Sequence, residues 1–230
     1  MWRSIRQLAL LAFLIAPARA AAGPEGHGEA QVRRMCAERS AIALALADHP
    51  ALRAWIVAEL DGRATGFPIA WDAAEPNTGR AAEHEFSLGH DMARLRVSSN
   101  ATGLDQLAGV VFELQNIRGF ETFEAAWQAA LRGEIGRLEF TRRMAACEFA
   151  ALTRTRALLE AHLAPMSMLE LRDHPLTGHL LDASPSLEEQ VLKYRRLGYD
   201  IVTHFDATYD HEIKPRMLLA NRGATPQRPW

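Results

Sequence analysis

The stretch LDQLAGVVFELQN, residues 104–116, decides the fold class because it has the spacing of an amphipathic helix and directly follows a strand-like segment. That segment, ARLRVSS at 93–99, alternates apolar residues with arginines, which is typical of a half-buried strand. Residues 100–103 supply the turn between the two elements. The helix carries an acid, Glu113, near its end. The question is whether Glu113 belongs to a site or to a solvated helix end.

The rest of the chain predicts an α+β fold that is mostly helical, with a small strand region before the helix at 104–116. The apolar spacing predicts further helices at 29–46, 51–60, 122–131, 134–163 and 184–198. Short alternating segments predict strands at 66–72 and 84–89, and a strand followed by a loop within 199–213.

The first twenty residues have the order of a secretory signal peptide: arginines, a short apolar run, then Ala18-Arg19-Ala20. The apolar run is shorter than the ~20 residues that a membrane span needs, so we expect cleavage after Ala20 rather than an uncleaved anchor. The mature protein is therefore expected in the periplasm or outside the cell, with no stable membrane span.

Behind the signal peptide, composition divides the chain into three parts. Residues 21–28 are small and polar and predict a flexible leader, residues 29–220 a single α+β domain, and residues 221–230 a loose C-terminal tail.

Charge argues against a nucleic-acid partner. The chain has 26 basic and 28 acidic residues, and cleavage after residue 20 removes Arg3, Arg6 and Arg19. The mature chain is then acidic, whereas nucleic-acid binding calls for a basic excess on one face. Arginine far outnumbers lysine, as is typical of proteins from GC-rich bacterial genomes.

Two cysteines, Cys36 and Cys147, remain in the mature chain. In an oxidising compartment the default expectation is that they pair, which predicts a disulfide that closes a long loop. Two buried free thiols are the alternative.

The order strand, turn and helix, with FELQN at 112–116, resembles the core of zincin metallopeptidases, whose helix carries H-E-x-x-H. Glu113 aligns with the general base of that motif, and Phe112 and Asn116 stand where the two zinc-binding histidines would be. In one branch of the family a carboxylate on a later helix is the third ligand, and Glu148 has a suitable place. The resemblance covers residues 93–163.

This resemblance implies a zincin-like fold without the parent activity, because catalytic zinc needs three protein ligands and phenylalanine cannot be one. It predicts a non-catalytic, pseudo-metallopeptidase binding protein without a cofactor. Glu113, Asn116 and Glu148 would line its cleft and hold an unknown protein, peptide or glycan ligand.

Several alternatives remain open. In the first, Glu113 is solvated, Phe112 is in the core and the helix frays at Gln115 and Asn116; the chain would then be a structural envelope protein. A hydrolase could use Glu113 and Glu148 as a catalytic carboxylate pair. A metal such as zinc could be held by the C-terminal cluster His204, Asp206 and His211, where strand alternation would put the first two on one face.

Overall fold

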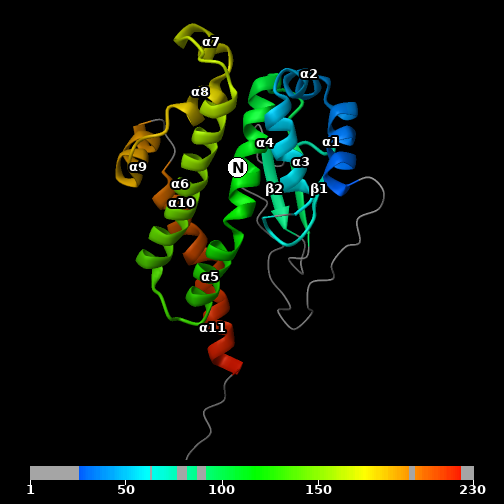
Figure 1. Ribbon diagram of the computed structural model, residues 1–230. Coiled ribbons are helices and arrows are strands. Elements are labelled where there is room, and N and C mark those ends of the chain that lie inside the picture. Colours follow the sequence, from blue (N-terminus) through cyan, green and yellow to red (C-terminus); the bar gives the residue numbers. More distant parts are fainter. Residues whose placement is uncertain (1–25, 63, 77–81, 87–91, 197–199, 224–230) are drawn as a thin grey trace, which may run out of the picture. The chain divides into compact units, whose positions relative to one another are not determined.

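The computed structural model describes residues 26–62, 64–76, 82–86, 92–196 and 200–223. The predicted signal peptide, most of the predicted leader and the last seven residues lie outside them. The fold is α+β: helices predominate, and three strands form one small sheet (Figure 1). The described chain forms two compact units. Unit 1 comprises the residues up to Arg118 and 152–182, and unit 2 comprises 119–151 and the residues from Ala183 onward.

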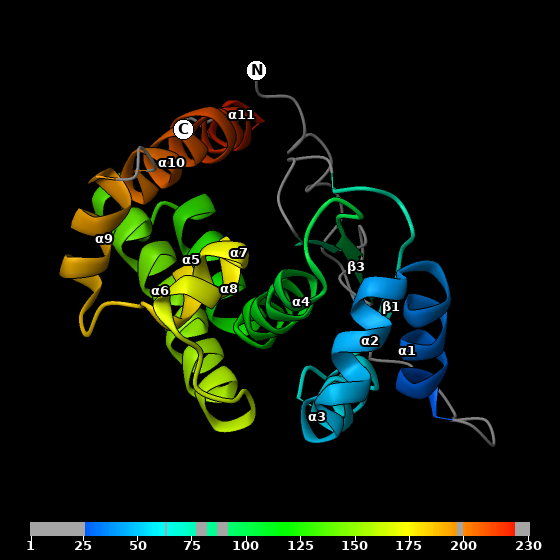
Figure 2. The same cartoon turned by 90° about the horizontal axis from the view of Figure 1, so that it is seen from above.

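Unit 1 contains the sheet and the helices that cover it. Its elements are α1 (His27–Glu38), α2 (Ser40–Asp48), α3 (Pro50–Leu60), β1 (Ile69–Trp71), β2 (Ala82–Phe86), β3 (Ala93–Val97), α4 (Gly103–Arg118), α7 (Met168–Asp173), α8 (Pro175–Leu181) and the second part of α6 (Arg137–His162). Helices α2 and α3 lie between α1 and α4 in both views (Figures 1 and 2).

The sheet has the order β1-β3-β2, with β1 parallel and β2 antiparallel to β3. In β3 the residues Ala93, Leu95 and Val97 are buried and face α4, as the alternation predicted. The opposite face is charged. There, the Arg96 guanidinium makes ion pairs with Asp72 (2.8 Å) and with the two glutamates of β2 (2.9 and 3.0 Å).

Side chains of α1 cover the free edge of β1. The Gln31 side-chain oxygen accepts a hydrogen bond from the Trp71 amide (2.8 Å), and the His27 ring lies 2.9 Å from the Ile69 carbonyl oxygen. These side chains satisfy backbone groups that a neighbouring strand would otherwise take.

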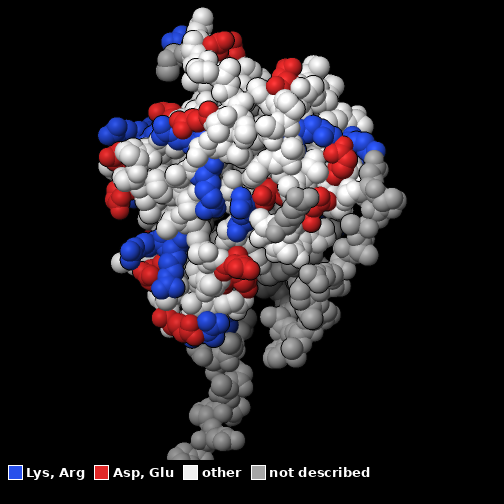
Figure 3. Space-filling model, viewed as in Figure 1, with Lys and Arg blue, Asp and Glu red and all other residues white. Residues whose placement is uncertain are grey.

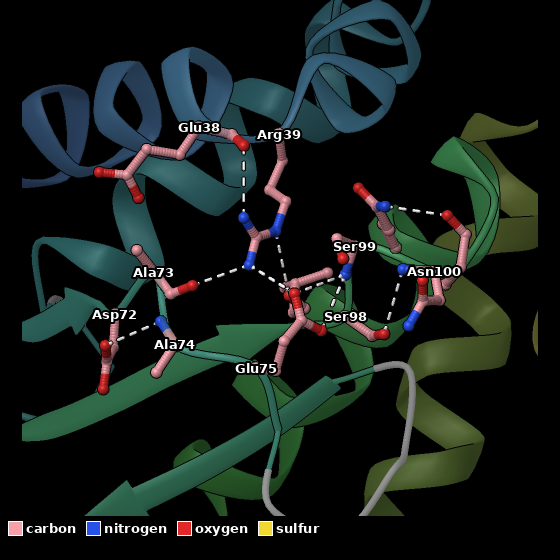
Figure 4. Close-up of polar contacts among 12 residues, drawn as sticks. Glu38, Arg39, Asp72, Ala73, Ala74, Glu75, Ser98, Ser99 and Asn100 are labelled. Carbon is pink, nitrogen blue, oxygen red and sulfur yellow. Dashed lines mark hydrogen bonds and ion pairs between the residues drawn. The ribbon is translucent and has the colours of Figure 1, made fainter.

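The expected helix 29–46 is broken at Arg39, which has φ −134° and ψ 86° and separates α1 from α2. Its guanidinium donates to the carbonyl oxygens of Val97 (3.2 Å) and Ala73 (2.8 Å) and pairs with Glu75 (Figure 4). Glu75 also accepts from the Ser99 amide. Through these contacts Arg39 connects the ends of β1 and β3. The contacts outweigh the helical pattern of residues 29–46.

Helix α4 is buried on most sides because it packs against β2, β3, α2 and α8. Its approach to β2 is close. A Cβ atom on Gly109 would lie 2.9 Å from the Ala82 Cβ atom, so the absence of a side chain at this position is what permits the contact.

Unit 2 is helical. Its elements are α5 (Phe120–Leu131), the first part of α6, α9 (Leu187–Arg196), α10 (Ile201–Thr208), a π-helical turn η1 (Tyr209–Ile213) and α11 (Lys214–Gly223). Stacked and tilted rings of Phe123, Trp127, Phe140 and Tyr209 run through its core.

The strand expected within 199–213 is wrong, because residues 201–213 are helical. Asp200 caps α10 by accepting hydrogen bonds from the amides of Val202 and Thr203. The buried residues Ile201 and Phe205 are four apart, which is a helical period. Helix α11 extends to Gly223, so the tail predicted from residue 221 begins as helix. Helix α1 likewise begins at His27, inside the predicted leader.

No disulfide joins Cys36 of α1 and Cys147 of α6, two residues that belong to different units. Burial raises the pKa of the Cys36 thiol, which keeps it protonated and weakly nucleophilic.

Among the described residues no single helix is both long and apolar enough to cross a membrane. Helices α2 and α3 reach that length and composition only together, and they are bent by 116° at the break between them. On the face shown in Figure 3, acidic and basic side chains are intermixed.

Candidate functional site

Glu113 is buried on α4, with an exposed fraction of 6%. The interpretation of this segment as a solvated, fraying helix end is therefore wrong. The helix continues to Arg118, Gln115 is 3% exposed, and Phe112 is half-buried rather than in the core. Gln115 is fixed by Arg154, whose guanidinium donates to its side-chain and backbone oxygens at 2.9 and 3.0 Å.

The partner of Glu113 is His84, in the middle of β2. The His84 Nδ1 atom lies 2.5 Å from the Glu113 Oε2 atom. The His84 side chain is 24% exposed and that of Glu113 is 8% exposed, so the carboxylate is inside and the imidazole is at the boundary with solvent.

The geometry of α4 and β2 explains why these two residues meet. Gly109 contacts Ala82 at the closest approach of the two elements. Four residues along a helix advance ~6 Å, and two residues along a strand advance ~6.6 Å. One turn beyond Gly109 is Glu113, and two residues beyond Ala82 is His84, on the same face of the sheet.

The surroundings of the pair are partly aromatic. The His84 ring packs edge-to-face against Phe86, with 5.2 Å between ring centroids, and Phe86 packs in the same manner on Phe67 at 6.1 Å. The edge-to-face contact with Phe86 favours the observed orientation of the imidazole ring.

The hydrogen bond also fixes the chemistry of the imidazole. An ionised carboxylate only accepts hydrogen bonds, so with Glu113 in that form the donor of this hydrogen bond is Nδ1 of His84. In the neutral ring Nε2 is then an acceptor, and on protonation it becomes a donor. The pair can therefore accept a hydrogen bond from a ligand or take up a proton at one defined atom.

Sequence analysis did not identify His84 as a site residue. The signal was present in the alternation of AEHEF at 82–86, which places His84 and Phe86 on one face and the glutamates on the other. The sequence alone does not show that β2 pairs with β3 or that β2 contacts α4, because both are contacts between distant parts of the chain.

Of the three residues predicted to line a cleft, Glu113 and Asn116 lie on α4 in unit 1, three residues apart, and Asn116 is half-buried. Glu148 is half-buried on the part of α6 that belongs to unit 2. The shared cleft and the carboxylate pair of Glu113 and Glu148 both stay predictions.

The C-terminal cluster does not form as predicted, because its residues are on a helix. His204 and Asp206 are two residues apart on α10 and thus on different faces. Asp206 accepts from the Thr141 hydroxyl (2.6 Å), and Arg137 lies 3.9 Å away. His211 is exposed on η1.

A zinc site does not fit the residues at the helix of unit 1. The described part of the chain contains no group of three His, Cys, Asp or Glu side chains that could hold a metal ion. At α4 the donor set is Glu113 with His84, and Phe112 and Asn116 stand where the zincin resemblance requires histidines. Two donors, already bonded to each other, fall short of the three protein ligands of catalytic zinc.

A second buried carboxylate, Glu59 of α3, lies near the end of α4. Burial raises its pKa, and the Arg118 guanidinium, 3.5 Å from Oε1, partly opposes this. Its Oε2 atom is buried and has no hydrogen-bond partner among the described residues. Unlike Glu113, this group is incompletely paired and adds a cost to folding at neutral pH.

Comparisons of the chain with models of protein families, with curated proteins and with solved structures find no match.

Proposed function

We propose that the chain is an exported, non-catalytic binding protein, and that His84, Glu113 and Asn116 form the centre of its ligand site. The observation that carries this proposal is the buried Glu113 carboxylate, whose Oε2 atom lies 2.5 Å from the Nδ1 atom of a histidine that is 24% exposed. Burying a carboxylate is costly unless it is paired. Here the partner is His84, and the hydrogen bond at Nδ1 leaves Nε2 for contact with a ligand at the boundary with solvent.

The resemblance of FELQN implies a zincin-like ancestor that has lost its metal ligands. In this proposal Glu113 no longer acts as a base on a metal-bound water. It orients His84 instead, and the imidazole and the Asn116 amide take over contact with the ligand.

The ligand class follows from these groups. Nε2 of neutral His84 accepts from a hydroxyl or amide N–H, and Asn116 can both donate and accept. The rings of Phe86 and Phe67 add an apolar contact beside the imidazole. A peptide or a glycan presents both kinds of group, and an exported protein meets both.

One observation favours a second candidate, a hydrolase. A histidine whose Nδ1 is held by a buried carboxylate has the arrangement that general-base histidines use, with Nε2 available to take a proton. In that case His84 is the base and Glu113 is a positioning residue that stabilises the imidazolium. Binding is preferred because the pair by itself supplies a base and its positioning residue but no nucleophile.

The two candidates separate in one experiment. The purified whole chain is applied to peptide and glycan arrays, and the dissociation constant of each bound compound is measured by calorimetry. We expect at least one ligand whose affinity falls tenfold or more in His84→Gln and is unchanged in the control His211→Gln, a change at an exposed histidine of unit 2.

Binding that is the same in both variants would contradict the proposal. Mass spectrometry of the incubated ligands tests catalysis: cleavage that disappears in His84→Gln would establish the hydrolase. Elemental analysis of the protein is the accompanying measurement. The expected result is no stoichiometric zinc, and one zinc per chain would overturn the metal-free site.

A further inference from the structure

The C-terminal helix of unit 2 contains a π turn that follows from its sequence. Helix α10 passes through η1 into α11, and the Lys214 amide donates to the Tyr209 carbonyl oxygen, five residues back. The next residue, Pro215, has no N–H, and its ring would collide with the carbonyl group of His211 in a regular α-helix. The wider turn relieves this collision. Such π turns are rare and occur frequently at functional sites.

The π turn borders a shallow pocket. The pocket has a volume of about 320 Å³ and is lined by residues of η1, α11 and α6: Arg137, Tyr209, Asp210, Lys214, Met217 and Leu218. All of them belong to unit 2. The volume is at the lower end for ligand pockets.

Of the three charged side chains in the lining, two pair with each other and one does not. Within the lining, Asp210 pairs with Arg137 at 3.1 Å, and Arg137 also lies 3.9 Å from Asp206, which is outside the lining. Lys214 is exposed and, among the residues that the structure describes, has no ion pair. The lining therefore has one positive charge in excess.

The remaining lining is apolar. The Tyr209 hydroxyl donates only a weak hydrogen bond to the Met217 sulfur atom, at 3.8 Å, and Leu218 is 54% exposed. The adjacent Leu219 is 67% exposed. A single unpaired ammonium beside exposed apolar side chains is complementary to a molecule with one negative charge and an apolar body.

We propose that this pocket binds a small monocarboxylate with an apolar body, such as a medium-chain fatty acid. The carboxylate pairs with Lys214, and the alkyl chain covers Met217, Leu218 and the Tyr209 ring. A cation is disfavoured, because Asp210 is already bonded to Arg137. This site is independent of the one proposed around His84, which lies in unit 1.

The small number of lysines allows Lys214 to be followed directly. Lys193 and Lys214 are the only lysines of the chain. Reductive methylation with ¹³C-formaldehyde keeps their charge and gives each a separate signal in the NMR spectrum. The probe is octanoate, which has ten non-hydrogen atoms, and the uncharged control is octan-1-ol.

We expect octanoate to shift the Lys214 signal with saturation and to leave the Lys193 signal in place, whereas octan-1-ol binds at least tenfold more weakly. Lys214→Gln should weaken octanoate binding at least fivefold, measured by calorimetry, and Lys193→Gln should not change it. Leu218→Ser should also weaken it, since the chain loses its apolar contact. Shifts of both lysines without saturation, or equal affinity in Lys214→Gln, would overturn the proposal.

Discussion

Each unit of the molecule has a carboxylate on a helix that is paired with a nitrogen-containing side chain, but the two pairs differ in burial. In unit 1, Glu113 and His84 are 2.5 Å apart, with side chains 8% and 24% exposed. In unit 2, Asp210 and Arg137 are 3.1 Å apart, with side chains 38% and 54% exposed. Water competes for the second pair and hardly for the first.

This difference determines how each site depends on the fold. The pair in unit 1 exists only while α4 and β2 are in close contact, so we expect stability and the proposed ligand binding to be lost together. The pair in unit 2 contributes little to stability, because exposed ion pairs are worth ~0–1 kcal/mol. Side chains around the π turn can be changed for binding studies with little effect on folding.

The largest effect is expected where the close approach in unit 1 is broken. In Gly109→Val the new Cβ atom would lie 2.9 Å from the Ala82 Cβ atom and 3.4 Å from a Leu176 methyl carbon. We expect the free energy of unfolding to fall by about 3 kcal/mol, since a packed interface must open. Chemical denaturation measures this change.

The control for this prediction is Gly136→Ala, at a glycine with no atoms near its virtual Cβ atom, for which a change within about 0.5 kcal/mol is expected. Equal stability of Gly109→Val and Gly136→Ala would show that α4 does not need to approach β2 closely.

The same contrast explains how far the sequence predicted the structure. The helix at 104–116 and the strand within 93–99 were predicted correctly, because the apolar residues of each follow one period and form one buried face. The long helix at 134–163 was predicted for the same reason and is α6. The spacing of apolar residues is sufficient to predict an element when the whole element follows one period.

Prediction failed where a distant contact or a single residue outweighs periodicity. Arg39 interrupts a helical pattern because its guanidinium satisfies carbonyl groups far away in the chain. Residues 199–213 alternate like a strand, but the Asp200 cap and the spacing of Ile201 and Phe205 favour helix. Glu113 was identified as a candidate from one motif, whereas His84 becomes visible only through the packing of β2 on α4.

A comparison of the two pairs by double-mutant cycles should give an intermediate effect. For His84→Ala and Glu113→Ala we expect a coupling energy of about 2 kcal/mol at pH 7, because removing His84 alone leaves a buried carboxylate without its partner. For Arg137→Ala and Asp210→Ala we expect less than about 0.5 kcal/mol. Urea unfolding of each variant gives these energies. Equal couplings in the two units would remove the distinction between a buried and an exposed pair.

The smallest effect concerns Glu59, whose carboxylate is buried like that of Glu113 but incompletely paired. Because burial raises its pKa in the folded protein above the value of 4.5 for the free side chain, folding favours the protonated form. This contribution to stability is complete below pH 4.5 and is lost as the pH rises through the folded pKa. Glu59→Gln, which is neutral at every pH, should therefore be more stable than the wild type by about 1 kcal/mol at pH 7.5.

At pH 4 that advantage should disappear, since both side chains are then uncharged. The control is Glu160→Gln, at an exposed glutamate paired with Arg156 one turn before it, which should stay within about 0.5 kcal/mol of the wild type at both pH values. Thermal or urea unfolding at the two pH values measures the difference. A stabilisation by Glu59→Gln that is the same at pH 4 and pH 7.5 would mean that packing, and not the buried charge, sets the energy of this carboxylate. The buried pair of Glu113 and His84 would then owe its strength to close packing as well.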